Sequence, residues 1–261
     1  MAIISDDNLC PGYPKYITQS LYRLRTLKLV PDSVDVWISH KPPPSYPKFP
    51  YKGIQYYEKR PPYVVGRSMI ESSVLPQKWK KDFERVDEVW VPSKFLVQVF
   101  LDAGVNEKIL HHIPESIDTH FYNPDQTTPL ELPGKKDFNF LSIFKWEERK
   151  GWDILLDAYF HEFSNQEDVC LYIQTYAFKS TKSLEKVVQK FVSQKTDLVK
   201  KKLPCFKLLT ETLERSEMPK LYKAADTFVL PSRGEGKVFF FFFLFFFFHF
   251  FFFFIIFIFD S

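Results

Sequence analysis

Cysteine is scarce in this 261-residue chain, which carries three: Cys10, Cys170 and Cys205, with no CxxC pair among them. A sparse and odd set of this kind argues against a disulfide framework and against a zinc ribbon. The pattern predicts three partly buried thiols in a reducing compartment. The first residues also lack a basic segment followed by a long apolar run, so no signal peptide is expected. Both absences favour a cytoplasmic protein.

An excess of charge of one sign is missing as well. The chain has 35 Lys and Arg against 32 Asp and Glu, a formal net charge of +3. This balance excludes a protein that coats nucleic acid, so no nucleic-acid partner is expected. Hydrophobic residues make up 45% of the chain, enough to build a core, which excludes global disorder.

Phenylalanine is plentiful, and it is concentrated at the end of the chain. Of the 30 Phe residues, 16 lie between Phe239 and Phe259. The stretch 238–259 is apolar apart from His249 and is long enough to span a bilayer. Its near-uniform composition instead favours translated intron or low-complexity DNA, because TTT encodes Phe and a valine codon, like an intron, begins with GT. We expect a Phe-rich low-complexity tail at 238–261, with a membrane anchor as the alternative.

The rest of the chain alternates short apolar runs with amphipathic segments. In the second half, strands are expected at 138–144, 169–176, 205–209 and 227–230, and helices at 152–163, 183–202 and 218–225. In the first half, strands are expected at 34–39, 63–65, 88–91 and 109–113, and a helix at 94–103 with Ser93 as its N-cap and Gly104 at its end. Strands separated by helices favour parallel pairing through right-handed crossovers.

Two proline-containing stretches interrupt this alternation. Seven prolines between Lys41 and Pro62 predict a long surface loop without regular structure. The polar stretch 123–136 is the natural boundary between two α/β units. The predicted fold is α/β, with two Rossmann-like parallel-sheet domains at 1–125 and 126–237. Ligands bind at the carboxyl ends of the strands in this architecture.

Two loops that directly follow predicted strands carry residues suited to a ligand. The first, KWEERKG, places Lys145, Arg149 and Lys150 at a strand end and before a helix, which suits a diphosphate. The alternative is a solvated turn in which the two glutamates neutralise the cations. The second, PSRGEG, offers Gly234 for close backbone approach and Glu235 to accept hydrogen bonds from hydroxyls, although a plain turn is the alternative.

Four motifs occur along the chain in one order: VPSKF (91–95), IPESID (113–118) with FYNP (121–124), RKGWDILL (149–156) and LYKAADTFVLPSRGEG (221–236). Together they resemble the group 1 (family 4) glycosyltransferases, nucleotide-sugar enzymes of the GT-B fold, from about residue 63 to residue 236. The resemblance implies transfer of a hexose from a UDP- or GDP-sugar to a hydroxyl acceptor, with retention of configuration. It implies no essential metal and no other cofactor.

The same resemblance implies roles for individual residues. Lys145, in the place usually held by Arg, and Lys150 would grip the donor diphosphate, with Arg149 and Gly234 beside them. Glu235 matches the first of two glutamates eight positions apart and would contact the transferred sugar, so Lys150 and Glu235 are the expected catalytic residues. The second glutamate would fall at position 243, which is Phe243.

Both domains also lack segments that the family pattern includes. The strands that follow PSRGEG in the family and the first strand and glycine-rich loop of the N-terminal domain are not recognisable. We therefore expect two incomplete domains. The competing hypothesis is that the chain is a non-catalytic truncated fragment or a mispredicted gene product of such an enzyme.

Three further residues are candidates for the acceptor side. The alternative for Glu71 is a surface carboxylate and that for His40 is a structural histidine, while Arg67 could pair with Glu71 or with phosphate. His111 and His112 lack a third ligand at metal spacing and are interpreted as strand residues. Asp226 fits a turn at a helix end better than a catalytic acid. The Lys-rich helix 183–202 could contact anionic lipid, with a solvated helix face as the alternative.

Overall fold

The computed structural model describes residues 34–52, 56–177 and 183–235, and it contains two compact units. The division between them falls after Ile117, and the second unit runs from Asp118 to Gly234. The predicted tail, Cys10 and position 243 lie outside the described residues.

The first unit contains a four-stranded sheet in the order β1-β4-β5-β6, and every neighbouring pair is parallel. Its strands are β1 (Val36–His40), β4 (Tyr63–Arg67), β5 (Glu88–Val91) and β6 (Leu110–His112). Helix α2 (Lys94–Asp102) and the 3-10 segments η3 (Gln77–Arg85) and η4 (Glu107–Ile109) complete this part of the chain. Ser93 caps α2 by accepting a hydrogen bond from the Leu96 amide, as predicted. Gly104 follows the helix at a φ of +80°, a left-handed conformation that favours glycine.

The proline-rich segment has more regular structure than predicted. It contains the 3-10 turn η2 (Pro43–Ser45) and the two-residue antiparallel strands β2 (Tyr51–Lys52) and β3 (Tyr56–Tyr57). The expectation of a loop without regular structure is therefore wrong, because proline is well suited to the first turn of a helix. The buried ring of Tyr46 anchors the segment on Gly66 of β4, where an added Cβ would lie 2.3 Å from the Tyr46 Cζ atom.

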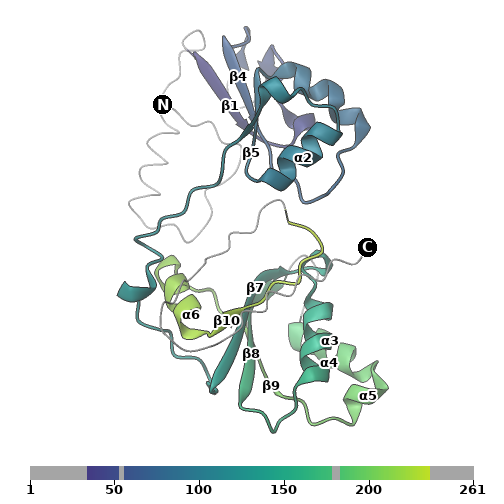
Figure 1. The fold of residues 1–261 in the computed structure, drawn as a ribbon, viewed down its shortest axis with the longest axis vertical. Helices are drawn as coiled ribbons and strands as arrows, with labels where there is room; N and C mark the ends of the chain where they lie inside the picture. The colour runs from purple at the N-terminus through teal and green to yellow at the C-terminus, as the bar shows by residue number, and fades with distance from the viewer. Residues whose placement is uncertain (1–33, 53–55, 178–182, 236–261) are drawn as a thin grey trace. The chain divides into compact units, whose positions relative to one another are not determined.

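The second unit contains a parallel sheet in the order β10-β7-β8-β9. Its strands are β7 (Phe138–Trp146), β8 (Val169–Ala177), β9 (Cys205–Leu209) and β10 (Thr227–Phe228). Helices α3 (Trp152–Glu162), α4 (Leu184–Ser193) and α5 (Thr196–Val199) lie on one side of the sheet, and α6 (Met218–Ala224) lies on the other (Figure 1). The short 3-10 turns are η5 (Pro124–Gln126), η6 (Glu148–Lys150) and η7 (Arg215–Glu217).

Alternation along the strands builds two cores, one on each face of this sheet. Phe144 and Trp146 of β7 pack with the helices α3 and α4, whereas Leu141 packs with Leu132 and with Leu221 of α6. A sheet that is covered on both faces by helices is the doubly wound arrangement. The prediction of an α/β fold with two parallel-sheet units is confirmed.

The predicted single helix 183–202 is instead two helices. Helix α4 ends at Ser193, and Lys195 has an extended backbone before α5 begins. The Lys195 ammonium lies 2.5 Å from the Asp157 carboxylate of α3 and 5.1 Å from the Phe191 ring centroid. The break changes the phase of the helix, so Leu198 is buried while Val199 is 58% exposed.

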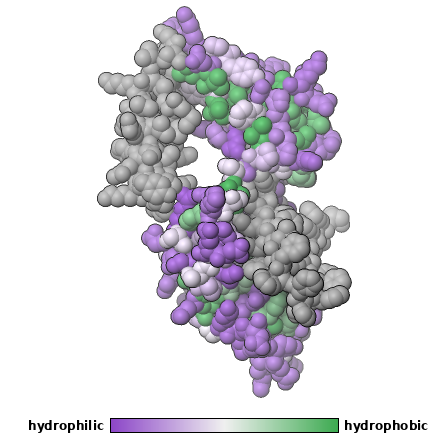
Figure 2. Space-filling view, turned by 60° about the vertical axis from the view of Figure 1, so that its left-hand side comes forward, coloured by the Kyte–Doolittle hydropathy of each residue, from purple (hydrophilic) through white to green (hydrophobic). Residues whose placement is uncertain are grey.

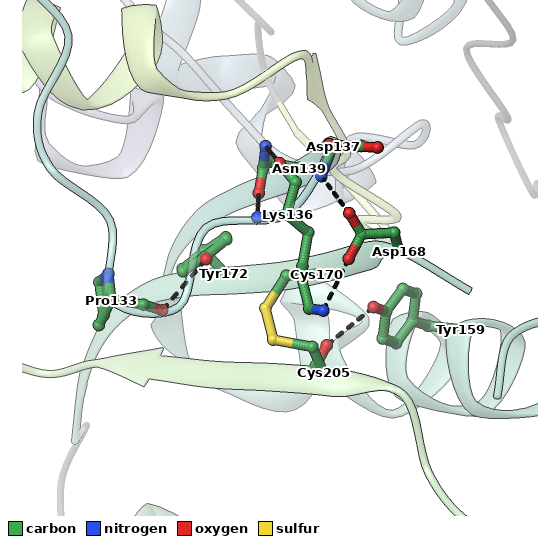
Figure 3. A network of polar contacts seen from close by, with 9 residues as sticks. All are labelled: Pro133, Lys136, Asp137, Asn139, Tyr159, Asp168, Cys170, Tyr172 and Cys205. Atoms are coloured by element: carbon green, nitrogen blue, oxygen red, sulfur yellow. Dashed lines mark hydrogen bonds and ion pairs between the residues drawn. A yellow bond between two sulfur atoms is a disulfide. The ribbon is translucent and has the colours of Figure 1, made fainter. Parts of the chain in front are cut away.

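Polar contacts tie together the amino-terminal ends of β7, β8 and β9 (Figure 3). Asp168, just before β8, accepts a hydrogen bond from the Lys136 ammonium at 2.6 Å and one from the Asp137 amide at 3.1 Å. Tyr159 of α3 donates to the Cys205 carbonyl of β9 at 2.8 Å. These contacts hold the amino-terminal ends of the strands together, so this end of the sheet has a structural role.

A disulfide joins Cys170 of β8 to Cys205 of β9, which are directly paired neighbours with Cα atoms 4.6 Å apart (Figure 3). The prediction of three free thiols is therefore wrong for these two residues. Spacing along the sequence does not reveal this pair, because the parallel crossover separates by 35 residues two positions that the sheet places side by side. The thiol pattern no longer supports a reducing compartment.

Asp226 links the edge strand β10 to β7. Its carboxylate accepts hydrogen bonds from the backbone amide of Asn139 at 2.8 Å and from the Asn139 side chain at 3.0 Å, and Asn139 is fully buried. This contact supports the interpretation of Asp226 as a structural residue. We expect Asp226→Ala to lower the free energy of unfolding by about 1–3 kcal/mol, because it leaves buried donors unpaired. Urea denaturation measures this loss, and an unchanged midpoint would contradict the assignment.

His161 of α3 connects to α5 and gives the second unit a pH-dependent contact. Its Nδ1 lies 2.7 Å from the Asp157 carbonyl oxygen and its Nε2 lies 2.5 Å from the Asp197 carboxylate. The carbonyl first, and then the carboxylate, raise the pKa of His161 above its usual value of 6.5. A raised pKa in the folded state stabilises the protein below the unfolded pKa, and this stabilisation is lost as the pH rises through the folded pKa.

We therefore expect His161→Gln to lower the melting temperature at pH 5.5 and to lower it much less at pH 8.5. The matched control is His112→Gln, the same substitution at an exposed histidine of β6 in the first unit. Melting curves at both pH values measure the effect. Equal losses for His161→Gln at both would show that the contact does not depend on the protonated ring.

The described surface is mixed in character. On the face shown in Figure 2, hydrophobic side chains form small patches among hydrophilic ones. Across residues 34–52, 56–177 and 183–235, every helix is too short or too polar to cross a bilayer. Within the same residues, no cluster of three or more His, Cys, Asp or Glu side chains is arranged to hold a metal ion.

Candidate functional site

The strand order of the second unit singles out the carboxyl ends of β7 and β10. From β7 the chain proceeds outward to β8 and β9, and it then returns to the opposite side of β7 to form β10. The loops that follow β7 and β10 therefore start at a point where the strand order reverses. In open α/β sheets, ligands bind outside the carboxyl ends of the strands at such a point. Both loops that the sequence predicted as ligand-binding lie here.

The first loop connects β7 to α3 and carries the three predicted cations. Lys145 is the last residue but one of β7, Arg149 and Lys150 belong to η6, and α3 begins at Trp152. The connection is short because Gly151 adopts a left-handed conformation with φ +69° and ψ +27°. The amino terminus of α3 therefore lies directly beside the cations. Backbone N–H groups at such a terminus favour bound anions.

The second loop, which follows β10, is held against the first by hydrogen bonds. The Arg233 amide donates to the Arg149 carbonyl at 2.8 Å, and the Ser232 hydroxyl donates to the same oxygen at 3.1 Å. In return, the Arg149 guanidinium donates to the Gly234 carbonyl at 2.6 Å. Two segments about 85 residues apart along the chain thus form one interlocked structure. Glu235, which is half-buried, directly follows it.

Gly151 allows the closest approach between the two loops. A Cβ atom at this position would lie 1.8 Å from the Pro231 carbonyl oxygen and 2.9 Å from its carbonyl carbon. The site therefore requires glycine at 151 for two independent reasons, its backbone conformation and the space next to it.

Acidic side chains balance the cations within the two loops. Glu147 lies 2.9 Å from the Arg149 guanidinium and 3.7 Å from the Lys145 ammonium. The alternative interpretation, a turn in which the glutamates neutralise the cations, predicts such contacts. The Arg233 guanidinium pairs with Asp153 and holds the pKa of that carboxyl below its usual value of 3.8. The cations of the two loops are therefore balanced by carboxylates, and the loops carry no large net charge.

The structure brings together two of the three predicted acceptor-side residues in the first unit. His40 ends β1 and Arg67 ends β4. The Arg67 guanidinium lies 3.2 Å from the His40 Nδ1 atom and donates to the Glu115 carboxylate at 2.5 Å. Because a guanidinium donates and does not accept, His40 Nδ1 must be the acceptor, which puts the ring proton on Nε2. Burial first, and then Arg67, lower the pKa of His40, which favours the neutral ring.

Glu115 is a residue that sequence reasoning missed. It lies in the IPESID motif just past β6, at the same edge of the sheet as His40 and Arg67. Like the residues of the two predicted loops, Glu115 follows a predicted strand, so the same signal could have identified it. Glu71, the third predicted residue, is exposed and lies four positions beyond the end of β4. His111 is a strand residue, as interpreted from the sequence, with its Nε2 atom 3.7 Å from the Glu88 carboxylate.

No known family model matches this sequence, and no curated protein matches it. Solved structures do resemble it. HepE from Anabaena, in complex with UDP and glucose, aligns at a TM-score of 0.48 and 17% identity, over 66% of this chain and 47% of that one. TarM aligns at 0.49 and 14%, over 77% and 37%. The pneumococcal O-GlcNAc transferase GtfA, in complex with UDP and GlcNAc, aligns at 0.45 and 14%, over 67% and 34%.

These similarities are similarities of the fold alone, over 66–77% of this chain. The chain spans about half the length of the HepE chain that it matches.

Proposed function

We propose that this protein is a retaining glycosyltransferase of group 1 (family 4) with the GT-B fold. It would transfer a hexose from a UDP- or GDP-sugar to a hydroxyl acceptor. The observation that carries the proposal is the meeting of two of the four ordered motifs, RKGWDILL and PSRGEG, at the strand-order reversal of the second unit.

In this proposal the residues of the two loops divide the donor between them. Lys145 and Lys150 contact the diphosphate, and the amino terminus of α3 adds backbone donors to it. As the bond between the sugar and the diphosphate breaks, negative charge grows on the phosphate oxygen, and the lysines stabilise this charge. Glu235 accepts hydrogen bonds from hydroxyls of the transferred sugar. Arg149 and Gly234 shape the site through their contact with each other.

The acceptor side would be formed by His40 and Arg67, with Glu71 as a further candidate. His40 in its neutral form offers an Nε2 proton, which can be donated to an oxygen of the acceptor. Neither the sugar nor the acceptor is specified by these residues, so the acceptor class is left open between glycan, lipid and protein.

Binding of nucleotides to the full chain tests the proposal. We expect isothermal titration to show saturable binding of UDP or GDP, with micromolar to millimolar affinity, and no requirement for a divalent cation. Binding of neither nucleotide would overturn the proposed function. A chain that binds UDP but neither hydrolyses UDP-glucose nor transfers glucose from it would support a second candidate function, that of a non-catalytic form of such an enzyme.

That second candidate is a truncated, non-catalytic form of such an enzyme. Phe243 stands where the family pattern places a second glutamate, and a Phe side chain offers no hydrogen-bond acceptor to a ribose. The candidate predicts nucleotide binding that is weakened and transfer that is absent.

Contact with a membrane is a further proposal for the Lys-rich segment that holds α4 and α5. Its lysines suit anionic headgroups. Co-sedimentation with anionic vesicles at low salt would support this contact, and the absence of co-sedimentation would remove it. A cytoplasmic location remains a proposal as well.

A further inference from the structure

An ion pair outside the predicted binding residues joins the two loops of the candidate site. The Arg233 guanidinium donates to both carboxylate oxygens of Asp153, at 2.8 and 2.7 Å, which is the bidentate geometry that Arg and carboxylates form best. The same guanidinium donates to the Glu148 carbonyl at 2.6 Å. One side chain of the second loop thus contacts both η6 and the first turn of α3.

The two ends of this pair lie next to the residues proposed to bind the donor. Asp153 is three residues after Lys150, across the turn at Gly151, and Arg233 is two residues before Glu235. The pair therefore fixes the distance between the backbone that carries Lys150 and the backbone at Gly234, within the second unit. It reinforces the hydrogen bond from the Arg233 amide to the Arg149 carbonyl.

The exposure of the pair favours a role in positioning the loops over a large contribution to the free energy of unfolding. The side chains of Arg233 and Asp153 are 39% and 32% exposed. Exposed ion pairs contribute little to the free energy of unfolding. Positioning is more sensitive, because a displacement of about 1 Å at a reacting group can cost about 100-fold in rate.

We propose that Arg233 and Asp153 are positioning residues, a clamp that sets the relative placement of Lys150 and Gly234 without contacting the donor. This inference rests on the proposed function, since it concerns the same donor site.

The test measures UDP affinity and melting temperature for the full chain and four variants. Arg233→Lys keeps the charge but loses the bidentate geometry, and Asp153→Asn removes the charge that orients Arg233. We expect each to raise the Kd for UDP at least fivefold. The matched control is Arg60→Lys, because Arg60 forms an ion pair of similar exposure with Asp87 in the first unit, 38% and 34%. We expect it to leave the Kd within twofold and to change the melting temperature as little as Arg233→Lys does.

Asp153→Asn separates a clamp from a direct ligand. If Arg233 bound the phosphates itself, releasing it from Asp153 would keep or tighten UDP binding, and that outcome would overturn the clamp. Guanidinium at millimolar concentration is expected to restore UDP binding to Arg233→Ala, which loss of folding would not allow, and failure of this rescue also counts against the clamp. If the wild-type chain binds UDP and the variants bind it equally well, the clamp alone is wrong. If the wild type binds neither UDP nor GDP, the proposed function fails and the clamp fails with it.

Discussion

Gly151→Ala is expected to lower the free energy of unfolding of the second unit by about 3–5 kcal/mol, one of the largest effects of any single substitution in this protein. The left-handed backbone at 151 disfavours any side chain. In addition, the new methyl group would overlap the Pro231 carbonyl at 1.8 Å. Backbone on both loops must move to relieve this overlap, so we expect UDP binding to be lost as well.

Gly134→Ala is the matched control, because it shares the conformation without the overlap. Its φ is +68°, and the nearest neighbouring atom to an added Cβ is the flexible Cε of Lys207 at 3.9 Å. We expect this variant to lose about 1 kcal/mol and to retain UDP binding. Urea denaturation of both variants measures the difference. If both lose the same stability, the contact between Gly151 and Pro231 does not hold the loops together.

Lys150→Ala is expected to raise the Kd for UDP by about 10- to 100-fold, which corresponds to about 1.4–2.8 kcal/mol. This is the size of effect associated with hydrogen bonds to charged groups. Stability should change by less than about 0.5 kcal/mol, since Lys150 lies in a surface turn outside the hydrophobic cores. Isothermal titration with UDP measures the affinity.

Lys207→Ala provides the comparison for this substitution. Lys207 is an exposed lysine of β9 in the same unit, so it tests whether loss of any positive charge weakens binding. We expect its UDP affinity to stay within twofold of the wild type. Equal affinities of wild type and Lys150→Ala would remove Lys150 from the diphosphate site.

Much of the fold follows from the sequence because the alternation of apolar runs and helical stripes reflects layers of strands and helices. The β5 and β9 boundaries match the predicted 88–91 and 205–209, and β7 extends the predicted strand at 138–144 by two residues. The placement of the two loops also follows, since each was predicted to leave the carboxyl end of a parallel strand. The position of each loop directly after a predicted strand is enough to place it at that end of the sheet.

The features that were missed depend on contacts between distant residues. The break at Lys195 arises from packing of α4 and α5 against α3, which a continuous amphipathic pattern does not reveal. Glu115 follows a predicted strand and could have been found by that signal, whereas Asp153 and Arg233 take their roles from each other, a contact that only the fold brings about. The predicted binding roles of Lys145, Lys150 and Glu235 remain predictions.

Hydrogen–deuterium exchange on adding UDP to the full chain tests the central claim most directly. If the loops after β7 and β10 bind the diphosphate, amides in 145–153 and 231–235 slow their exchange together, while those at the opposite edge around 136–139 and 168–170 do not change. Saturable UDP binding that protects neither loop would show that the nucleotide binds elsewhere and that the site described here is not the donor site.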